Sequence, residues 1–159
     1  MKVRLVSLFL LIALVATVGT AAAGSERNFR THLSGDEAGV ETLAQGQAIF
    51  QFSKDGQTMH YNILVANLDE VVGAHIHLAP AGSNGPIVAG FIGAPFIPDD
   101  DAITVNGNLV EGDIAANDLT GPLSGGTLMN LKNAMQQEMT YVNIHTIENR
   151  GGEIRGQID

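Results

Sequence analysis

The chain has 159 residues, 45% of them apolar, with 8 Lys and Arg against 17 Asp and Glu and a formal net charge of -9 at pH 7. This length fits one globular domain, and the apolar content is too high for a disordered chain. The acidic charge argues against nucleic-acid binding, which needs a basic surface, and the absence of Cys excludes a disulfide-stapled fold.

The N-terminal segment has the three parts of a secretory signal peptide. Lys2 and Arg4 precede a mostly apolar stretch over 5–18, and the small residues 21–23 follow it. This order is typical of a cleavable signal, so we expect a secreted domain, extracellular or periplasmic, over 24–159. An uncleaved membrane anchor is the less favoured alternative, because the segment only just reaches the roughly 20 residues that span a bilayer.

Downstream of this segment, the chain consists of short β-like runs separated by turn residues, which predicts a single all-β domain. Turn chemistry is clearest in Lys54-Asp55-Gly56, between two apolar runs. The expected strands cover 28–33, 46–52, 58–65, 71–78, 87–92, 102–114 with a turn near 106–108, 140–147 and 152–158.

One segment favours a helix. Thr127 can cap a run in which Leu128, Leu131, Ala134 and Met135 recur at helical spacing. The expected fold class is therefore all-β, as a Greek-key or immunoglobulin-like β-sandwich with one short helix packed on the sheets.

Strand alternation separates most of the histidines from the predicted core. Successive side chains of a strand point to opposite faces. Along 71–78 the even-numbered residues are apolar and form the core face, which leaves His75 and His77 on the other face. The same alternation places His60 and His145 on the non-core faces of their own strands.

A hairpin would bring three of these histidines together. If 58–65 and 71–78 pair around the Asn-Leu turn between them, His60 lies directly across from His75, with His77 one diagonal step away. His145 joins them only if its strand lies next to this pair of strands.

Imidazole clusters of this kind bind transition metals. A His-x-His sequence on a strand supplies two neutral nitrogens from one face, and three or four imidazoles without a thiolate suit copper first and zinc second. Tyr141 and Asn143 would flank the ion or stand at an open position. The predicted metal ligands are His60, His75, His77 and His145.

The alternative is a solvated polar face whose histidines bond to Asn62, Asn143 or water. The two interpretations differ in their response to pH. Because a ligand nitrogen must be deprotonated, metal affinity is expected to fall as the pH drops through roughly 6 to 7. A polar face without a metal predicts no such dependence.

Three separated motifs resemble the CHRD domain family. They are AHIHLAPAGSNGPIV at 74–88, YVNIHT at 141–146 and GEIRGQ at 152–157, and the resemblance covers nearly all of 28–159. It implies an extracellular β-sandwich-like module with no established enzymatic activity, and a shared structural or ligand role for His75 and His77 together with His145. A more distant likeness is to copper/zinc superoxide dismutase, another sandwich with a His-x-His strand.

The function predicted from the sequence is that of a secreted binding protein with a histidine-lined metal site. An interaction module for an extracellular protein or matrix partner is the alternative, and a copper oxidoreductase is the weaker one. The sequence contains no combination of residues typical of nucleophilic catalysis. The run Asp99 to Asp101 suits a solvated turn better than a calcium site. Glu153 and Arg155 suit a structural role.

Overall fold

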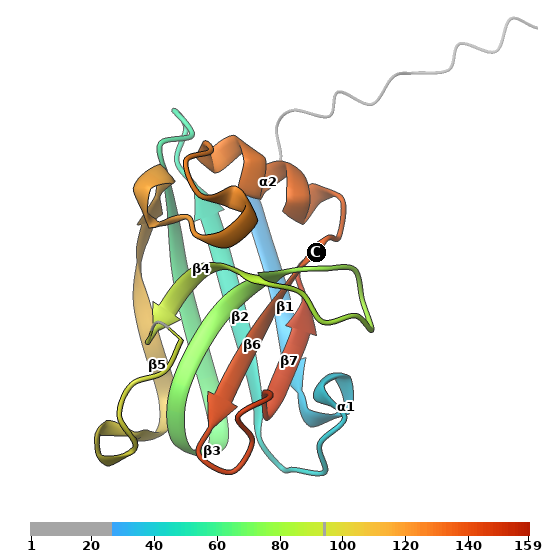
Figure 1. Ribbon diagram of the computed structural model, residues 1–159, viewed down its shortest axis with the longest axis vertical. Coiled ribbons are helices and arrows are strands. Elements are labelled where there is room, and N and C mark those ends of the chain that lie inside the picture. Colours follow the sequence, from blue (N-terminus) through green and yellow to red (C-terminus); the bar gives the residue numbers. More distant parts are fainter. Residues whose placement is uncertain (1–26, 94) are drawn as a thin grey trace, which may run out of the picture.

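The computed structural model describes residues 27–93 and 95–159, and the predicted signal peptide lies outside them. The domain is built from strands, as predicted (Figure 1). The strands are β1 Asn28–Ser34, β2 Gln45–Phe52, β3 Thr58–Leu78, β4 Ile87–Ile92, β5 Ile103–Ala115, β6 Thr140–Thr146 and β7 Ile154–Gln157. The helices are α1 Gly35–Ala38, α2 Leu128–Gln136 and the 3-10 turns η1 Asp99–Asp101, η2 Ala116–Asp118 and η3 Gly121–Leu123.

The strands form one antiparallel sheet that closes on itself. Hydrogen-bonded neighbours run β3–β2–β1–β7–β6 and back to β3, while β4 and β5 each pair only with β3. The first half of β3 pairs with β2 and its second half with β6, so this strand closes the ring. The all-β prediction is confirmed, whereas the two-sheet, immunoglobulin-like sandwich is not.

The predicted hairpin between 58–65 and 71–78 is wrong. Both segments belong to β3, which runs for 21 residues without reversing. The expected turn is instead a set of register shifts against β5, with Asn67 and Glu70 at positive φ values of 54 and 51. Such bulges bend a strand and increase its twist, which lets one strand serve both sides of the ring. The turn expected near 106–108 is likewise absent, because β5 is continuous there.

The interior of the ring is apolar, and α2 covers one end of it (Figure 1). The helix prediction is confirmed: the Thr127 N–H donates to the Asn130 side chain at 2.8 Å, and Leu131 and Met135 are buried. α1 was not expected.

Burial of each large apolar side chain contributes about 1.5–3 kcal/mol. Fully buried interior residues include Leu33, Phe50, Met59, Ile63, Ile76, Val142, Ile144 and Ile154.

The second half of β3 and all of β6 are buried on both faces. Their inner faces belong to the core, and their outer faces lie beneath chain segments that follow β3, β4 and β6.

Within the described residues, no helix is long and apolar enough to cross a membrane.

Candidate metal centre

Three histidines meet on the covered outer face of the β3–β6 pair. His75 and His77 lie two residues apart on β3, so both point to this face. His145 lies on β6 opposite Gly73, which has no side chain to occupy the space in front of it. A Cβ at Gly73 would lie 2.9 Å from both the His75 ring and the Phe96 ring, so only glycine leaves room for the cluster.

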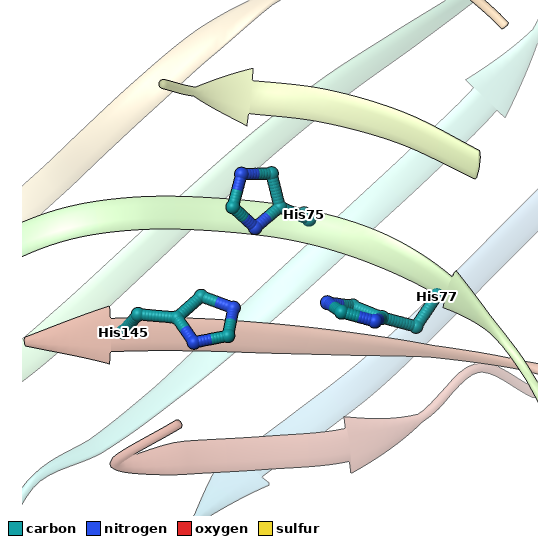
Figure 2. A group of neighbouring side chains, drawn as sticks. All are labelled: His75, His77 and His145. Atoms are coloured by element: carbon teal, nitrogen blue, oxygen red, sulfur yellow. The ribbon is translucent and has the colours of Figure 1, made fainter. Parts of the chain in front are cut away.

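The three rings converge on a common point. Their centroids are 5.9 Å apart for His75 and His77, 5.1 Å for His75 and His145, and 5.8 Å for His77 and His145. Figure 2 shows a nitrogen of each ring turned toward the space between them. One nitrogen from each ring lies within 4.8 Å of the other two, and this is the only such group among the residues that the structure describes.

The cluster is buried, which contradicts the alternative of a solvated polar face. His75 is 1% exposed, His77 8% and His145 5%. The Phe96 ring packs edge-on against His145 and His75, with centroids 5.3 and 6.5 Å away. Arg150 stacks over Phe96 at 5.3 Å, and its guanidinium also bonds to a carboxylate of η1. The histidines are therefore shielded from water rather than hydrated.

Backbone carbonyls set the orientation of two of the rings. Nδ1 of His77 lies 2.9 Å from the Gly85 carbonyl oxygen, and Nδ1 of His145 lies 2.9 Å from that of Arg150. A carbonyl oxygen can only accept a hydrogen bond, so each Nδ1 carries the hydrogen and each Nε2 keeps a free lone pair. This is the arrangement in which a neighbouring acceptor fixes the tautomer of a metal-binding histidine.

The remaining ring nitrogens are buried and lack a hydrogen-bond partner. Nε2 of His77, Nε2 of His145 and both nitrogens of His75 have no hydrogen-bond partner of acceptable geometry within the described residues. Leaving one buried polar group unpaired costs about 1–3 kcal/mol. Several such groups at one point indicate a site that is completed by something the chain does not itself supply.

The electrostatics favour neutral imidazoles. Burial, helped by the neighbouring histidines, lowers the pKa of His75 and of His145 from 6.5 to about 4, although nearby backbone groups oppose both shifts. The His77 pKa is also lowered, first by burial and then by the Arg155 charge, although the hydrogen bond to Gly85 opposes the shift. Neutral imidazole is the form that coordinates a metal.

A stacked arrangement supports His77 from its other side. The Tyr141 ring lies parallel to His77 at 4.9 Å, and the buried guanidinium of Arg155 lies 3.4 Å from the centre of the Tyr141 ring. The Gly85 N–H donates to the Tyr141 hydroxyl at 3.1 Å, so the backbone of one residue, Gly85, contacts both rings. Arg155 also donates to the Ser83 carbonyl and the Asn84 side chain, which fixes the loop that carries Gly85.

The predicted flanking residues both lie at the cluster. Tyr141 stands across from His77 and Asn143 across from His75. The Asn143 amide nitrogen donates to the Gly151 carbonyl at 2.9 Å, while its buried Oδ1 has no donor within the described residues. Asn143 therefore offers one oxygen acceptor at the edge of the site.

His60 does not join the cluster, because the hairpin that was to carry it there does not form. It pairs with Gln51 and Asp113 at the far end of β3. Its side chain is 47% exposed, with Nδ1 3.1 Å from Asp113 and Nε2 3.2 Å from Glu111. Three of the four predicted ligands thus come together, and the fourth belongs to a surface charge cluster.

Sequence reasoning did not find the residues that cover and orient the rings. Phe96, Gly85 and Arg150 lie in loops, where periodicity carries no information about contacts. One signal was available: Gly73 interrupts the apolar half of β3, and an isolated glycine in a strand often marks the close approach of another group.

A comparison with known proteins places almost the whole domain in one family. The family model described as the CHRD domain matches residues 29–158. Neither a curated protein nor a solved structure shows a significant match to the chain.

Proposed function

The chain belongs to the CHRD domain family, and from this premise we propose that it is a secreted binding protein that holds one transition metal ion through His75, His77 and His145. The observation that carries the proposal is the convergence of unpaired, buried imidazole nitrogens within 4.8 Å of one another. Copper is the first candidate ion and zinc the second.

The chemistry of the donor set supports this choice of ion. Neutral imidazole nitrogens suit copper and zinc, whereas calcium and magnesium prefer oxygen ligands. Copper stands above zinc in the usual order of affinity for such ligands.

The energetics disfavour a cluster without an ion. A hydrophobic packing role would be served better by apolar side chains, since each unpaired imidazole nitrogen keeps a desolvation cost. An ion removes that cost at several nitrogens at once, and the two carbonyl-bound rings are already turned for it. Three protein ligands leave a further coordination position open, as in sites that exchange a ligand.

A metal titration with matched variants tests the proposal. Purified protein is titrated with copper(II) and zinc(II) at neutral pH by calorimetry, alongside His75→Ala and His60→Ala. We expect one ion per chain, loss of the tight site in His75→Ala, and unchanged binding in His60→Ala, whose ring lies outside the cluster. Equal affinity in wild type and His75→Ala would overturn the proposal and leave the interaction-module interpretation.

A further inference from the structure

A second candidate site lies between α2 and the β2–β3 turn, and it shares no residue with the histidine cluster. It is a pocket of about 320 Å³. Its lining includes Arg27, which precedes β1, Lys54 in the turn and Lys132 on α2. These are three of the six Lys and Arg residues within the described ranges, in a chain of net charge -9. Such a concentration of positive charge on an acidic protein attracts an anion.

Lys132 is the central feature of this pocket. It is only 8% exposed, and its ammonium lies 5.9 Å from the centre of the Phe52 ring. No hydrogen bond or ion pair in the described part of the chain uses it. Its nitrogen is not one of the fully buried side-chain atoms that lack a partner, so the aliphatic stem is buried while the charged end reaches the pocket. The ammonium is therefore placed to contact an anion that enters the pocket.

The charge of the pocket identifies the kind of anion. Three cations face one carboxylate, that of Asp55, which leaves a net charge of +2 (3 − 1) on the lining. The Asp55 carboxylate is already engaged within its own turn, where it accepts from the Ser53 hydroxyl at 2.6 Å and from the Gln57 N–H at 3.1 Å. A phosphate monoester, with about −1.5 to −2 charges at neutral pH, matches this lining better than a single carboxylate.

The apolar part of the lining implies that the anion is attached to an organic body. Phe52, at the end of β2, and Met129 on α2, which is 51% exposed, both line the pocket. Small-molecule sites combine such apolar surface with a few placed charges. Inorganic phosphate would leave this apolar surface uncovered.

We propose that the pocket formed by Arg27, Lys54 and Lys132 binds an organic phosphate monoester, with the phosphate among the three cations and the organic group against Phe52 and Met129. The site is independent of the proposed metal function, and either can fail alone.

The test is an NMR titration of isotope-labelled protein with phenyl phosphate at low salt, followed at the Gly56 amide in the pocket. Saturable shifts at millimolar concentration are expected, with inorganic phosphate binding roughly 5-fold more weakly because it buries no apolar surface. Equal affinity for phenyl sulfate, a monoanion, would overturn the assignment to a phosphate ester. Absence of saturation would overturn the site.

Variants separate a built site from general attraction. Lys132→Gln is expected to weaken binding by at least about 10-fold, since a charge-assisted hydrogen bond is lost, and Lys132→Arg to retain most of it. Arg30→Gln, an exposed cation outside this pocket, serves as the matched control and should change binding less than about 2-fold. Equal losses in Lys132→Gln and Arg30→Gln would refute the proposal. If Lys132→Gln fails to fold, exposed Lys54→Gln takes its place with the same expected direction.

Discussion

Two histidines on the outer face of the same strand have opposite environments. His60, near the start of β3, is 47% exposed and lies between Asp113 and Glu111. His75, near the end of β3, is 1% exposed and has no hydrogen-bond partner of acceptable geometry in the described chain. Both satisfy the same alternation rule, so the face of a strand alone does not make a site. The covering loop makes the difference, because it removes water and leaves the nitrogens to a ligand.

The largest expected difference between the buried cluster and the exposed His60 is in how each affects the free energy of unfolding at acidic pH. In the folded state the pKa of His75 and His145 is about 4, whereas in the unfolded chain it returns to about 6.5. Between these values the unfolded state binds more protons, so the free energy of unfolding decreases as the pH falls from 6.5 to 4. The decrease is about 3 kcal/mol for each histidine, and it is absent above pH 6.5.

Urea denaturation of the metal-free protein at pH 6.5 and 4.5 measures this effect. The variant His75→Gln with His145→Gln should lose most of the pH dependence, while His60→Gln should keep it. A wild-type pH dependence that survives the double substitution would contradict the assignment to the cluster. The same lowered pKa values also move the expected loss of metal affinity from pH 6–7 toward pH 4.

Metal-linked stabilisation should likewise distinguish the cluster from the exposed histidine. A free copper concentration 100 times the dissociation constant should raise the free energy of unfolding by about 2.7 kcal/mol. Thermal or urea unfolding with and without the ion gives this value. His145→Ala should abolish the increase, and His60→Ala should preserve it. A similar increase in His145→Ala would place the ion elsewhere.

Removing the Tyr141 hydroxyl, which helps to hold His77 in place, should lower metal affinity less than removing a ligand histidine. Tyr141→Phe keeps the ring that stacks on His77 and removes the hydroxyl that accepts from the Gly85 N–H. We expect metal affinity to fall by about 10-fold, the lower end for residues that orient a ligand. Competition with a chelator measures the change, and Tyr61→Phe, at a tyrosine outside the cluster, is the control. No change in Tyr141→Phe would mean that the stacking alone orients His77.

The smallest effect is expected at the exposed histidine. His60→Asn removes the contacts to Glu111 and Asp113, which are solvent-exposed and screened by salt. Exposed ion pairs contribute about 0–1 kcal/mol, so the free energy of unfolding should change by less than about 0.5 kcal/mol. A larger loss would show that the charge cluster on β3 and β5 stabilises the closed sheet.

Part of this site could be predicted from the sequence. The two-residue spacing of His75 and His77 required a common face, and the alternation around His145 was correct as well. The segment between 65 and 71 could not be predicted, because a turn and a bulged strand use the same residue types. Asn67 adopts a left-handed conformation compatible with either. That ambiguity produced the error for His60.

The sequence by itself determined the all-β class, the family, the helix after Thr127 and the strand face of the four predicted ligand histidines, because all of these depend on local spacing. Only the tertiary structure decided that the sheet closes through β3, that Phe96 covers the cluster, and that carbonyls of Gly85 and Arg150 hold two rings. Those features join residues far apart in the chain. Their pairing depends on how the chain packs in three dimensions, which a local pattern does not encode.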